Sequence, residues 1–462
     1  MTVSVIGAGL AGCEAAWQLA CRGIPVTLHE MKPVRFSPAH RYEGFAELVC
    51  SNSLKANRIG SAAGLLKEEM YRLGSIVVRC ARETAVPAGG ALAVDRYLFS
   101  DCITKMVTEH PLITVRREEV TQIPEGPVII ASGPLTSDGL SKAIGKLLGE
   151  AYLSFYDAAS PIVAFDSIDT NKAFFAARYG KGEDDYINCP MNREEYEAFH
   201  AALISAESVE LKEFEQDRMK VYEGCMPVEV LAKRGSDSIR FGPLKPVGLR
   251  DPRTGHRPWA VVQLRAENAQ KTLYNLVGFQ TNLRFPEQKR VFSMIPGLEN
   301  AEFVRYGVMH RNTFLNSPKL LDASYCFRKD RRIYFAGQMT GVEGYIESAA
   351  SGILAGINMA MALRQKPALI LPADTMMGAL AAYISDPTVT DFQPMGSNMG
   401  LLPPCPERIK EKALRYQTVA QRALDSLESC LSDFVAETGD LLAVEQDCLS
   451  EEKPMNRKAG VL

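Results

Sequence analysis

The 462-residue sequence contains no CxxC pair and no group of cysteines at the spacing of metal ligands. Its eleven cysteines are scattered along the chain, and their number is odd. Scattered thiols are typical of a reducing compartment, where disulfides rarely persist. We therefore expect free thiols, some of them reactive, and no bound metal.

The sequence also has little that would direct it into or across a membrane. The first residues, MTVSVIGAG, lack the basic segment and the apolar segment of a secretion signal. The most apolar run, residues 353–363, is short and is interrupted by Gly356 and Asn358. We predict a cytoplasmic protein without a membrane-spanning helix.

No excess of either charge marks the chain as a whole. The formal net charge is −3, and hydrophobic and charged residues make up 46% and 23% of the sequence, as in an ordinary globular protein with a sizeable core. A nucleic-acid partner would need a local basic surface. Residues 231–311 contain 14 Lys or Arg and 6 Asp or Glu, a net charge of +8.

The N-terminus carries a nucleotide-binding fingerprint. The β-branched run 3–6 predicts a strand, GAGLAG follows with Gly7, Gly9 and Gly12, and CEAAWQLACRG predicts a helix. PVTLHE then predicts a second strand that ends at Glu30. Glycines let the backbone approach a pyrophosphate, the helix N-terminus offers N–H groups, and the acid accepts a ribose hydroxyl. This order predicts a bound dinucleotide.

Two later segments favour FAD over a nicotinamide. GPVIIASGP predicts a strand that returns to the nucleotide, and RRIYFAGQMTGVEGYIESAASGILAG predicts a strand, a glycine-rich turn and a helix near a flavin ring. No second GxGxxG follows a strand, so NAD(P)H would dock as a transient reductant. The predicted cofactor-binding residues are Gly7, Ala8, Gly9, Leu10, Ala11, Gly12, Glu30, Gly133, Gly337, Gln338, Gly341, Glu343 and Gly344.

We expect an α/β protein whose FAD-binding, doubly wound Rossmann-like domain is formed by residues 1–155 and 317–365. A large inserted α+β domain, 156–316, is expected on the RNA or substrate side. A C-terminal helical segment, 366–440, includes an amphipathic helix, because apolar residues recur there at steps of three and four from Ile409 to Phe434. Residues 441–462 are expected to form a flexible tail.

Two cysteines precede segments that could begin helices. Cys50 stands before Ser-Asn-Ser, residue types that cap helix N-termini, and Cys225 stands before Pro227 in YEGCMPVEVLAKRG. A helix N-terminus favours the thiolate. These thiols could form a redox pair, or one could act as a nucleophile and the other as its proton-transfer partner.

Several long motifs make the sequence similar to one family. GAGLAGCEAAWQLA, FAELVCSNSLKAN, VPAGGALAVDR, EGCMPVEVLAKRG and FAGQMTGVEGYIESAASG resemble the folate-dependent tRNA uracil-5 methyltransferases, the TrmFO family. The resemblance runs from the first residue to about residue 436. It implies an enzyme that uses methylenetetrahydrofolate as carbon donor, FADH2 as reductant and NAD(P)H to reduce the flavin.

The resemblance also implies a substrate and residue roles. The substrate is the uridine at position 54 in the T-loop of tRNA, which becomes 5-methyluridine. Cys225 is implied as the nucleophile on the pyrimidine C6, and Cys50 as the group that removes the C5 proton. No obligate protein partner is evident.

The basic stretch suggests the RNA-contacting residues Arg240, Lys245, Arg250, Arg253 and Arg257. A solvated basic face that balances the acidic half of the inserted domain remains the alternative. Among the other polar residues, His29, His40, His310 and Cys189 are expected to be structural, and Glu343 is a candidate to face flavin or folate.

Three other functions stay open. The same chemistry could act on a uridine of ribosomal RNA. A related flavin- and folate-using enzyme modifies wobble uridines, but its chain is longer and it needs a GTPase partner. A thiol redox flavoprotein would bind FAD without transferring carbon.

Overall fold

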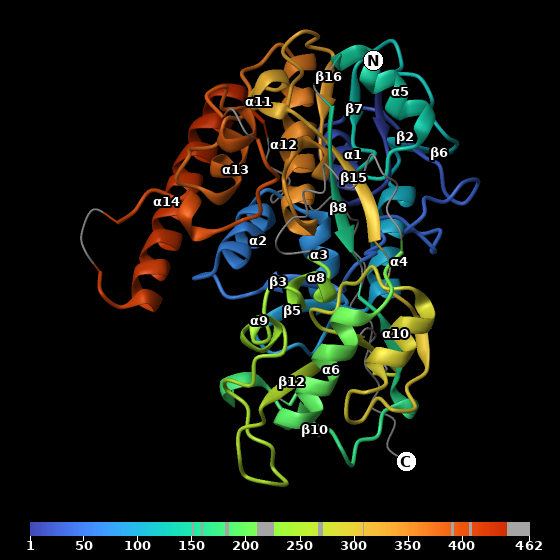
Figure 1. Ribbon diagram of the computed structural model, residues 1–462. Coiled ribbons are helices and arrows are strands. Elements are labelled where there is room, and N and C mark those ends of the chain that lie inside the picture. The colour runs from blue at the N-terminus through green and yellow to red at the C-terminus, as the bar shows by residue number, and fades with distance from the viewer. Residues whose placement is uncertain are drawn as a thin grey trace, which may run out of the picture.

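The structure is a computed structural model that describes residues 1–149, 152–158, 160–180, 184–209, 226–266, 271–307, 309–389, 392–405 and 409–440. Figure 1 shows two layered parts, one around β2 (Val26–Glu30) and β7 (Val128–Ile130) and the other around β10 (Phe174–Phe175) and β12 (Ala260–Ala266). Each part has its own apolar core. The predicted α/β architecture with a nucleotide-binding sheet and a C-terminal helical segment is confirmed.

The first part is built on a five-stranded parallel sheet. Four of its strands are fully or mostly buried, short and rich in Val and Ile, as expected where helices cover both faces, and the edge strand β6 (Ile113–Arg117) buries only Ile113. The strand order is β16 (Ile333–Phe335), β7 (Val128–Ile130), β1 (Val3–Ile6), β2 (Val26–Glu30) and β6 (Ile113–Arg117). The sheet therefore joins the chain's N-terminal third to a strand more than 200 residues later.

Two long helices cross closely beside this sheet. Helix α1 (Leu10–Cys21) follows the glycine-rich turn, and α12 (Tyr345–Leu363) packs along it. A side chain at Gly352 would collide with the main chain of Ala11, so glycine permits the close approach. By length and composition α12 could cross a membrane, but 83% of its most apolar stretch is buried inside the protein. It is the central core helix of the first part.

Shorter elements complete the first part. They comprise α2 (Ala62–Arg72), α3 (Ile76–Glu83), α4 (Arg96–Glu109) and α5 (Asp138–Leu148), with a small antiparallel sheet of β3 (Ser53–Ala56), β5 (Ala91–Val94) and β4 (Ala85–Val86). Ser61, Ser75 and Asp95 cap α2, α3 and α4 with their side-chain oxygens, which explains where these helices begin.

The second part is built on a six-stranded antiparallel sheet. The order is β10 (Phe174–Phe175), β11 (Tyr186–Met191), β12 (Ala260–Ala266), β13 (Leu273–Leu276), β9 (Ile162–Ala164) and β14 (Phe303–Arg305). The helices of this part are α6 (Arg193–Ser205), α8 (Val228–Ala232), α9 (Ser238–Phe241) and α10 (Phe285–Phe292). The strands β8 (Tyr152–Ala158) and β15 (Met309–Leu315) pair with each other where the chain enters and leaves this part.

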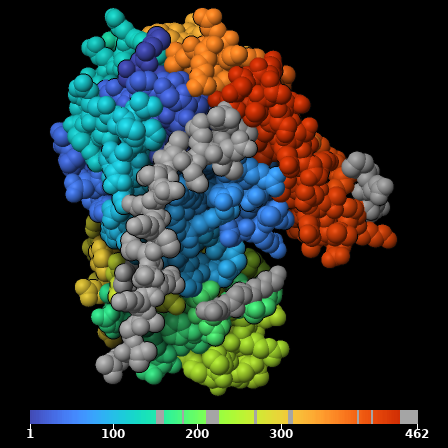
Figure 2. All heavy atoms as spheres, turned by 180° about the vertical axis from the view of Figure 1, so that it is seen from behind, coloured from blue at the N-terminus to red at the C-terminus, as the bar shows by residue number. Residues whose placement is uncertain are grey.

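The C-terminal segment lies on one flank of the first part. It contains α13 (Met376–Ser385) and α14 (Lys412–Thr438), and the short α11 (Ser317–Leu320) contacts α13. The predicted amphipathic helix is confirmed for its second half, where α14 buries Ala420, Leu424, Leu427, Leu431 and Phe434. Ile409 precedes the helix and Ala413 is exposed, so the first part of the predicted apolar series is wrong. Figure 2 shows this segment in red, extending sideways from the upper half. The predicted tail lies outside the described residues.

Candidate active site

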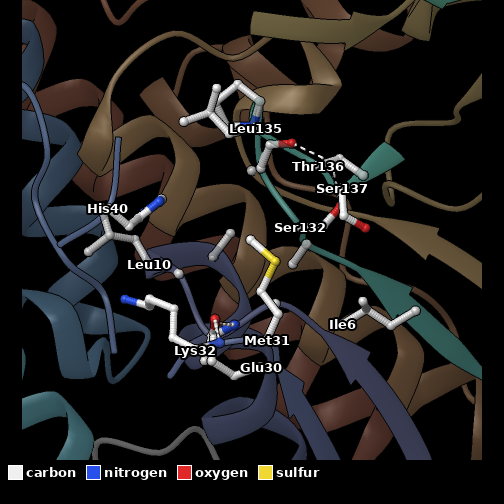
Figure 3. A pocket seen from close by; sticks show the side chains of 18 of the residues that line it. Ile6, Leu10, Glu30, Met31, Lys32, His40, Ser132, Leu135, Thr136 and Ser137 are labelled. Carbon is white, nitrogen blue, oxygen red and sulfur yellow. Dashed lines mark hydrogen bonds between the residues drawn. The ribbon is translucent and has the colours of Figure 1, made fainter. Parts of the chain in front are cut away.

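A deep cavity opens at the carboxyl ends of the parallel strands, where doubly wound sheets bind ligands. We call it the dinucleotide cavity; it has a volume of about 1150 Å³ including its open mouth. Figure 3 shows Glu30, Met31 and Lys32 on one side of it and the segment from Ser132 to Ser137 on the other. The lining of this cavity comes from the glycine-rich turn, the end of β2 and the segments after β7 and β16, which is where this kind of fold holds an extended cofactor.

The glycine-rich turn forms the floor of the dinucleotide cavity. Gly7 has φ = 99°, and its N–H donates to the carbonyl oxygen of His29 at 2.8 Å. A Cβ at Gly7 would lie 2.6 Å from the carbonyl oxygen of Ala131, so a larger residue would push the turn off the sheet. Gly9 begins α1 without a side-chain cap. The first N–H groups of α1 are thus left for an anionic ligand.

The acid at the end of β2 is held in place by main-chain donors. The N–H groups of Ala8 and Lys32 each donate to a different oxygen of the buried Glu30 carboxylate, both at 2.9 Å. Each oxygen keeps a lone pair that can accept a ribose hydroxyl. The Lys32 ammonium is buried and donates to the carbonyl oxygens of Tyr42 and Gly44 at 2.9 and 2.7 Å, which fixes the loop above Glu30.

The structure brings most of the predicted cofactor-binding residues to this cavity. Those that line it are Gly7, Ala8, Gly9, Leu10, Ala11, Glu30, Gly133, Gly337 and Gln338, and His29 and His40 line it as well. Gly12, Gly341, Glu343 and Gly344 are not among its lining residues. Gly12 packs beneath the turn against Gly7, and Gly341 packs against the Phe392 ring. Glu343 is buried and accepts a hydrogen bond from the Gln338 amide at 2.8 Å.

Cys50 is not itself among the lining residues of the cavity, but it lies next to it, beside Tyr345, the first residue of α12. The thiol sulfur is 2.9 Å from the Tyr345 hydroxyl oxygen, and the Cys50 N–H donates to the same oxygen at 2.8 Å. Both Tyr345 and the neighbouring Val49 line the cavity. Burial, with a smaller contribution from Cys50, raises the pKa of Tyr345 well above its usual value. The tyrosine therefore keeps its proton and can donate a hydrogen bond to a thiolate.

The predicted helix after Cys50 is wrong. Ser53–Ala56 forms strand β3, because buried Leu54 alternates with exposed neighbours and pairing with β5 satisfies the backbone. Asn52 caps no helix: its amide donates to the carbonyl oxygens of Val94 and Ala266 at 3.0 and 2.8 Å. No helix dipole therefore acts on Cys50 from this side.

Positive charge reaches the Cys50 segment from arginine side chains instead. Arg265, on β12 of the antiparallel sheet, donates to the Asn52 amide oxygen at 2.9 Å and to the Ser51 hydroxyl at 2.7 Å. It is 7% exposed. Arg96, at the start of α4, donates to the carbonyl oxygens of Leu48 and Val49. Residues from both parts of the molecule thus hold the thiol's main chain.

The other candidate thiol, Cys225, lies outside the described residues. The helix predicted to follow it is confirmed as α8, although Pro227 stands at the N-cap and not at the first helical position. Glu229 is buried and accepts from the Thr281 hydroxyl and the Asn282 N–H. The structure thus anchors the chain just after Cys225 to residues 280–282. His310 is on β15, and its side chain is not described.

Cys189 is fully buried in β11, and its burial raises the pKa of the thiol to about 12. It therefore stays protonated. Within the described part of the chain, no group of three or more His, Cys, Asp or Glu side chains is arranged to hold a metal ion.

The five suggested RNA-contacting residues divide into two kinds. Arg240 stacks on the Trp259 ring, 3.8 Å from its centroid, and Arg253 is paired with Asp251 at 2.7 Å, so both support the local fold. Lys245, Arg250 and Arg257 are exposed. Only the second kind presents its charge freely to solvent.

Sequence reasoning missed Tyr345 and Arg265. The signal for Tyr345 was present, because it follows Gly344 as the first residue of the helix expected beside the flavin. The signal for Arg265 was a charged residue inside the apolar run AVVQLRA, a pattern that points to a buried, partnered arginine.

Comparison with known proteins places this geometry in a family. The family model described as "Glucose inhibited division protein A" matches residues 2–367. Two crystal structures of Aquifex aeolicus GidA, with TM-scores of 0.67 and identities of 17% and 18%, cover 93% and 95% of this chain, which spans 73% and 78% of theirs. At such identity the likeness shows the fold.

Closer relatives are much more similar in sequence. A protein of Acetivibrio thermocellus is 60% identical over 94% of this chain and 99% of its own, and one of Heliobacterium modesticaldum is 59% identical over 94% and 98%. A protein of Halalkalibacterium halodurans is 57% identical over 92% and 98%. All three are named methylenetetrahydrofolate--tRNA-(uracil-5-)-methyltransferase TrmFO. At this identity over nearly the full length of both chains, the protein belongs to the TrmFO family.

Proposed function

We propose that the protein is a methylenetetrahydrofolate-dependent tRNA (uracil-5-)-methyltransferase that forms 5-methyluridine at position 54 of the T-loop. The observation that carries the proposal is the Cys50 thiol, hydrogen-bonded to Tyr345, which lines the dinucleotide cavity. The names and high identity of the relatives support the reaction class.

The dinucleotide cavity fits FAD. The Gly7–Leu10 turn and the open start of α1 would hold the pyrophosphate, Glu30 would accept the ribose hydroxyls, and Gly337 and Gln338 would border the ring system. Bound FAD, reduced by NAD(P)H, would supply the two electrons needed to convert a methylene group into a methyl group. The protein's own task is to bring the uracil, the folate and this cofactor together in one site.

Cys50 acts as the general base in this proposal. Uracil C5 must lose its proton after the new carbon–carbon bond has formed, and a thiolate can accept it. The Tyr345 hydroxyl oxygen accepts two main-chain N–H groups, at 2.8 Å from Cys50 and 3.4 Å from Ser51, so its own hydrogen is free to point at the sulfur. A donated hydrogen bond stabilises the thiolate, and the Arg265 bonds to Ser51 and Asn52 fix its position.

Cys225 is proposed as the nucleophile. Its thiolate would add to uracil C6, which makes C5 an enolate carbon able to attack the methylene group of the folate. After the C5 proton has moved to Cys50, the bond between the transferred carbon and the folate nitrogen breaks, tetrahydrofolate leaves and an exocyclic methylene group remains on C5. Two electrons and a proton, delivered as a hydride, would convert this methylene into the methyl group while the bond between C6 and sulfur breaks and the thiolate is regenerated. Each turnover thus forms one carbon–carbon bond and consumes one methylenetetrahydrofolate and two electrons.

The RNA would be held by the inserted unit, residues 156–316, which carries the basic stretch. A T-loop uridine is stacked inside folded tRNA, so it would have to leave the stack to reach the cavity. Exposed Lys245, Arg250 and Arg257 are the cations of this stretch best placed to meet phosphates.

The test uses purified protein, NADPH, and folate labelled in the methylene carbon, with unmodified tRNA and ribosomal RNA transcripts in parallel. We expect label in the T-loop uridine of tRNA, and loss of that label when position 54 is changed to cytidine. If label appeared only in ribosomal RNA, the proposed reaction would stand, but the substrate would be a ribosomal RNA uridine and not the T-loop of tRNA. Label only at a wobble uridine would replace the T-loop as the site.

A fourth outcome would contradict the whole reaction. If the FAD-loaded protein transferred no label to any RNA, it would be a thiol redox flavoprotein, and Cys50 would need another role.

A further inference from the structure

A second hollow lies next to β10, the strand at one edge of the antiparallel sheet. Figure 1 shows β10 at the opposite end of the molecule from β7. We call this second hollow the Tyr179 hollow. It has a volume of about 1070 Å³ and is lined by residues of two segments, 176–180 and 248–257. It shares no residue with the dinucleotide cavity. A ligand bound here would therefore be separate from the one at Cys50.

Tyr179 is held in an unusual conformation in this hollow. Its φ and ψ are 61° and 20°, in the left-handed region that residues with a Cβ rarely adopt. The Tyr179 N–H donates to the carbonyl oxygen of Gly248 at 2.9 Å. The ring packs so closely on Gly248 that a Cβ there would be 3.0 Å from three ring atoms. A strained residue kept in place by its surroundings is often part of a functional site.

The strain leaves a large aromatic surface in solvent. The Tyr179 side chain is 62% exposed, although a tyrosine ring gains free energy by being buried. Arg178, beneath it, donates to the Gln263 side chain at 2.7 Å and to the carbonyl oxygen of Val247 at 2.8 Å. These bonds fix both walls of the hollow. The exposed Tyr179 ring is therefore attached to a segment that hydrogen bonds hold in place.

Two cations without an ion-pair partner among the described residues also line the hollow. Arg250 and Arg257 are exposed and line the hollow, and neither forms an ion pair with any residue that the structure describes. Arg253, between them in sequence, is neutralised by Asp251 and turns its guanidinium toward the carbonyl oxygen of Asn171. The hollow therefore combines one aromatic face with two guanidinium groups and no carboxylate among its lining residues.

We propose that the Tyr179 hollow binds an unpaired nucleotide of the RNA substrate, other than the one that is methylated. The base stacks on the Tyr179 ring, and the flanking phosphates contact Arg250 and Arg257. An aromatic platform beside a cationic groove is the arrangement with which proteins bind single-stranded nucleic acid. The inference rests on the proposed function, since it takes tRNA as the ligand. It adds a docking site remote from the reacting uridine.

The test measures binding of full-length tRNA transcript and catalysis separately. Tyr179→Ala is expected to raise the dissociation constant about tenfold, whereas Tyr179→Phe keeps the ring and stays near wild type. Arg250→Ala/Arg257→Ala is expected to weaken binding and to reduce the slope of log Kd against log salt by about two. Lys105→Ala/Lys366→Ala removes two exposed charges outside the basic stretch 231–311 and serves as the matched control.

Catalysis supplies the second readout. With saturating tRNA, the Tyr179 and arginine variants should keep the wild-type kcat and show only a raised KM. Thermal melting of each variant checks that it is folded. A p-benzoylphenylalanine at position 179 should crosslink to a tRNA nucleotide other than uridine 54.

Three results would overturn the proposal. The first is unchanged tRNA affinity and salt slope in folded Tyr179→Ala and in the double arginine variant. The second is a crosslink to uridine 54 itself. The third is tight binding of free uridine monophosphate in the hollow that tRNA does not displace. If wild type binds tRNA without methylating it, the proposed function fails while the hollow remains testable by affinity and crosslinking; if it binds no tRNA, both fail.

Discussion

The dinucleotide cavity is built from main-chain groups and buried side chains, whereas the Tyr179 hollow is built from exposed side chains. In the first, Gly7 and Glu30 have single permitted conformations, because hydrogen bonds and close contacts surround them. In the second, Arg250 and Arg257 extend into solvent without a carboxylate partner among the described residues. The contrast predicts near-total losses from changes in the cavity and graded, salt-dependent losses from changes in the hollow.

The largest effect on FAD binding is expected from Gly7→Ala. The new Cβ would stand 2.6 Å from the carbonyl oxygen of Ala131 at a backbone φ of 99°, so the turn must shift away from the pyrophosphate site. A penalty of about 3 kcal/mol corresponds to roughly 100-fold weaker FAD binding. The measurement is flavin absorbance after purification and titration with FAD.

Gly145→Ala is the matched control, because Gly145 has ordinary helical geometry and no atom near its missing Cβ. It should bind FAD as wild type does. If Gly7→Ala retained FAD with unchanged affinity, the turn would not be the pyrophosphate site.

Cys50→Ala is expected to lower kcat by about 10²- to 10⁴-fold, the usual contribution of a general base. The affinity for tRNA and the FAD content should stay unchanged, because Cys50 touches neither the glycine-rich turn nor the basic surface. Single-turnover methylation and tRNA binding separate these quantities.

Cys430→Ala, a thiol on α14 outside both sites, is the control for the loss of one cysteine. If Cys50→Ala kept full activity, another group would have to accept the C5 proton, and Cys50 would not be the general base.

Arg265→Met tests whether the two parts are independent. The residue belongs to the antiparallel sheet, yet it holds Ser51 and Asn52 beside Cys50. Its loss should lower kcat by about 10- to 100-fold through misplacement of the thiol, and it should lower the melting temperature because the Asn52 amide oxygen loses its partner. The tRNA affinity should change little.

Arg265→Lys sharpens this experiment. Lysine keeps the positive charge but cannot reach two acceptors with a planar fork, so we expect only partial recovery of kcat. Full recovery would mean that charge alone matters at this position. A fall in tRNA affinity with normal kcat would assign Arg265 to RNA binding.

Much of the nucleotide-binding fold could be predicted from the sequence. The glycine spacing, the β-branched strands and Glu30 all belong to a local pattern of about thirty residues, and local patterns dictate their own geometry. Gly12 belongs to this pattern but does not line the cavity, because it packs against the main chain of Gly7 from below the turn.

The surroundings of Cys50 could not be predicted in the same way. Ser-Asn-Ser suits a helix cap and an irregular strand equally well, and tertiary pairing with β5 decided between them. Tyr345 lies 295 residues from Cys50 and Arg265 about 215. The sequence near Cys50 therefore cannot show which distant residues contact this segment. The backbone conformation of Tyr179 could not be predicted either, because nothing in the sequence ARYG indicates a tyrosine in the left-handed region.

The smallest effect is expected from Tyr345→Phe, which removes one hydroxyl and keeps the ring. Burial raises the pKa of Tyr345 well above its usual value, so the hydroxyl keeps its proton and can donate a hydrogen bond to a Cys50 thiolate. Without this donor the thiolate is less stable and a higher pH is needed to form it. We expect about tenfold lower kcat at neutral pH and a rising limb of the pH profile displaced upward by about one unit.

The same profile separates a chemical role from a structural one. If the hydroxyl only positioned the main chain through the N–H groups of Cys50 and Ser51, kcat would fall equally at every pH and the rising limb would not move. Recovery of wild-type kcat in Tyr345→Phe at high pH therefore identifies the hydroxyl as a donor to the thiolate. A displacement toward lower pH would contradict that assignment, because it would mean that the tyrosine favours the protonated thiol.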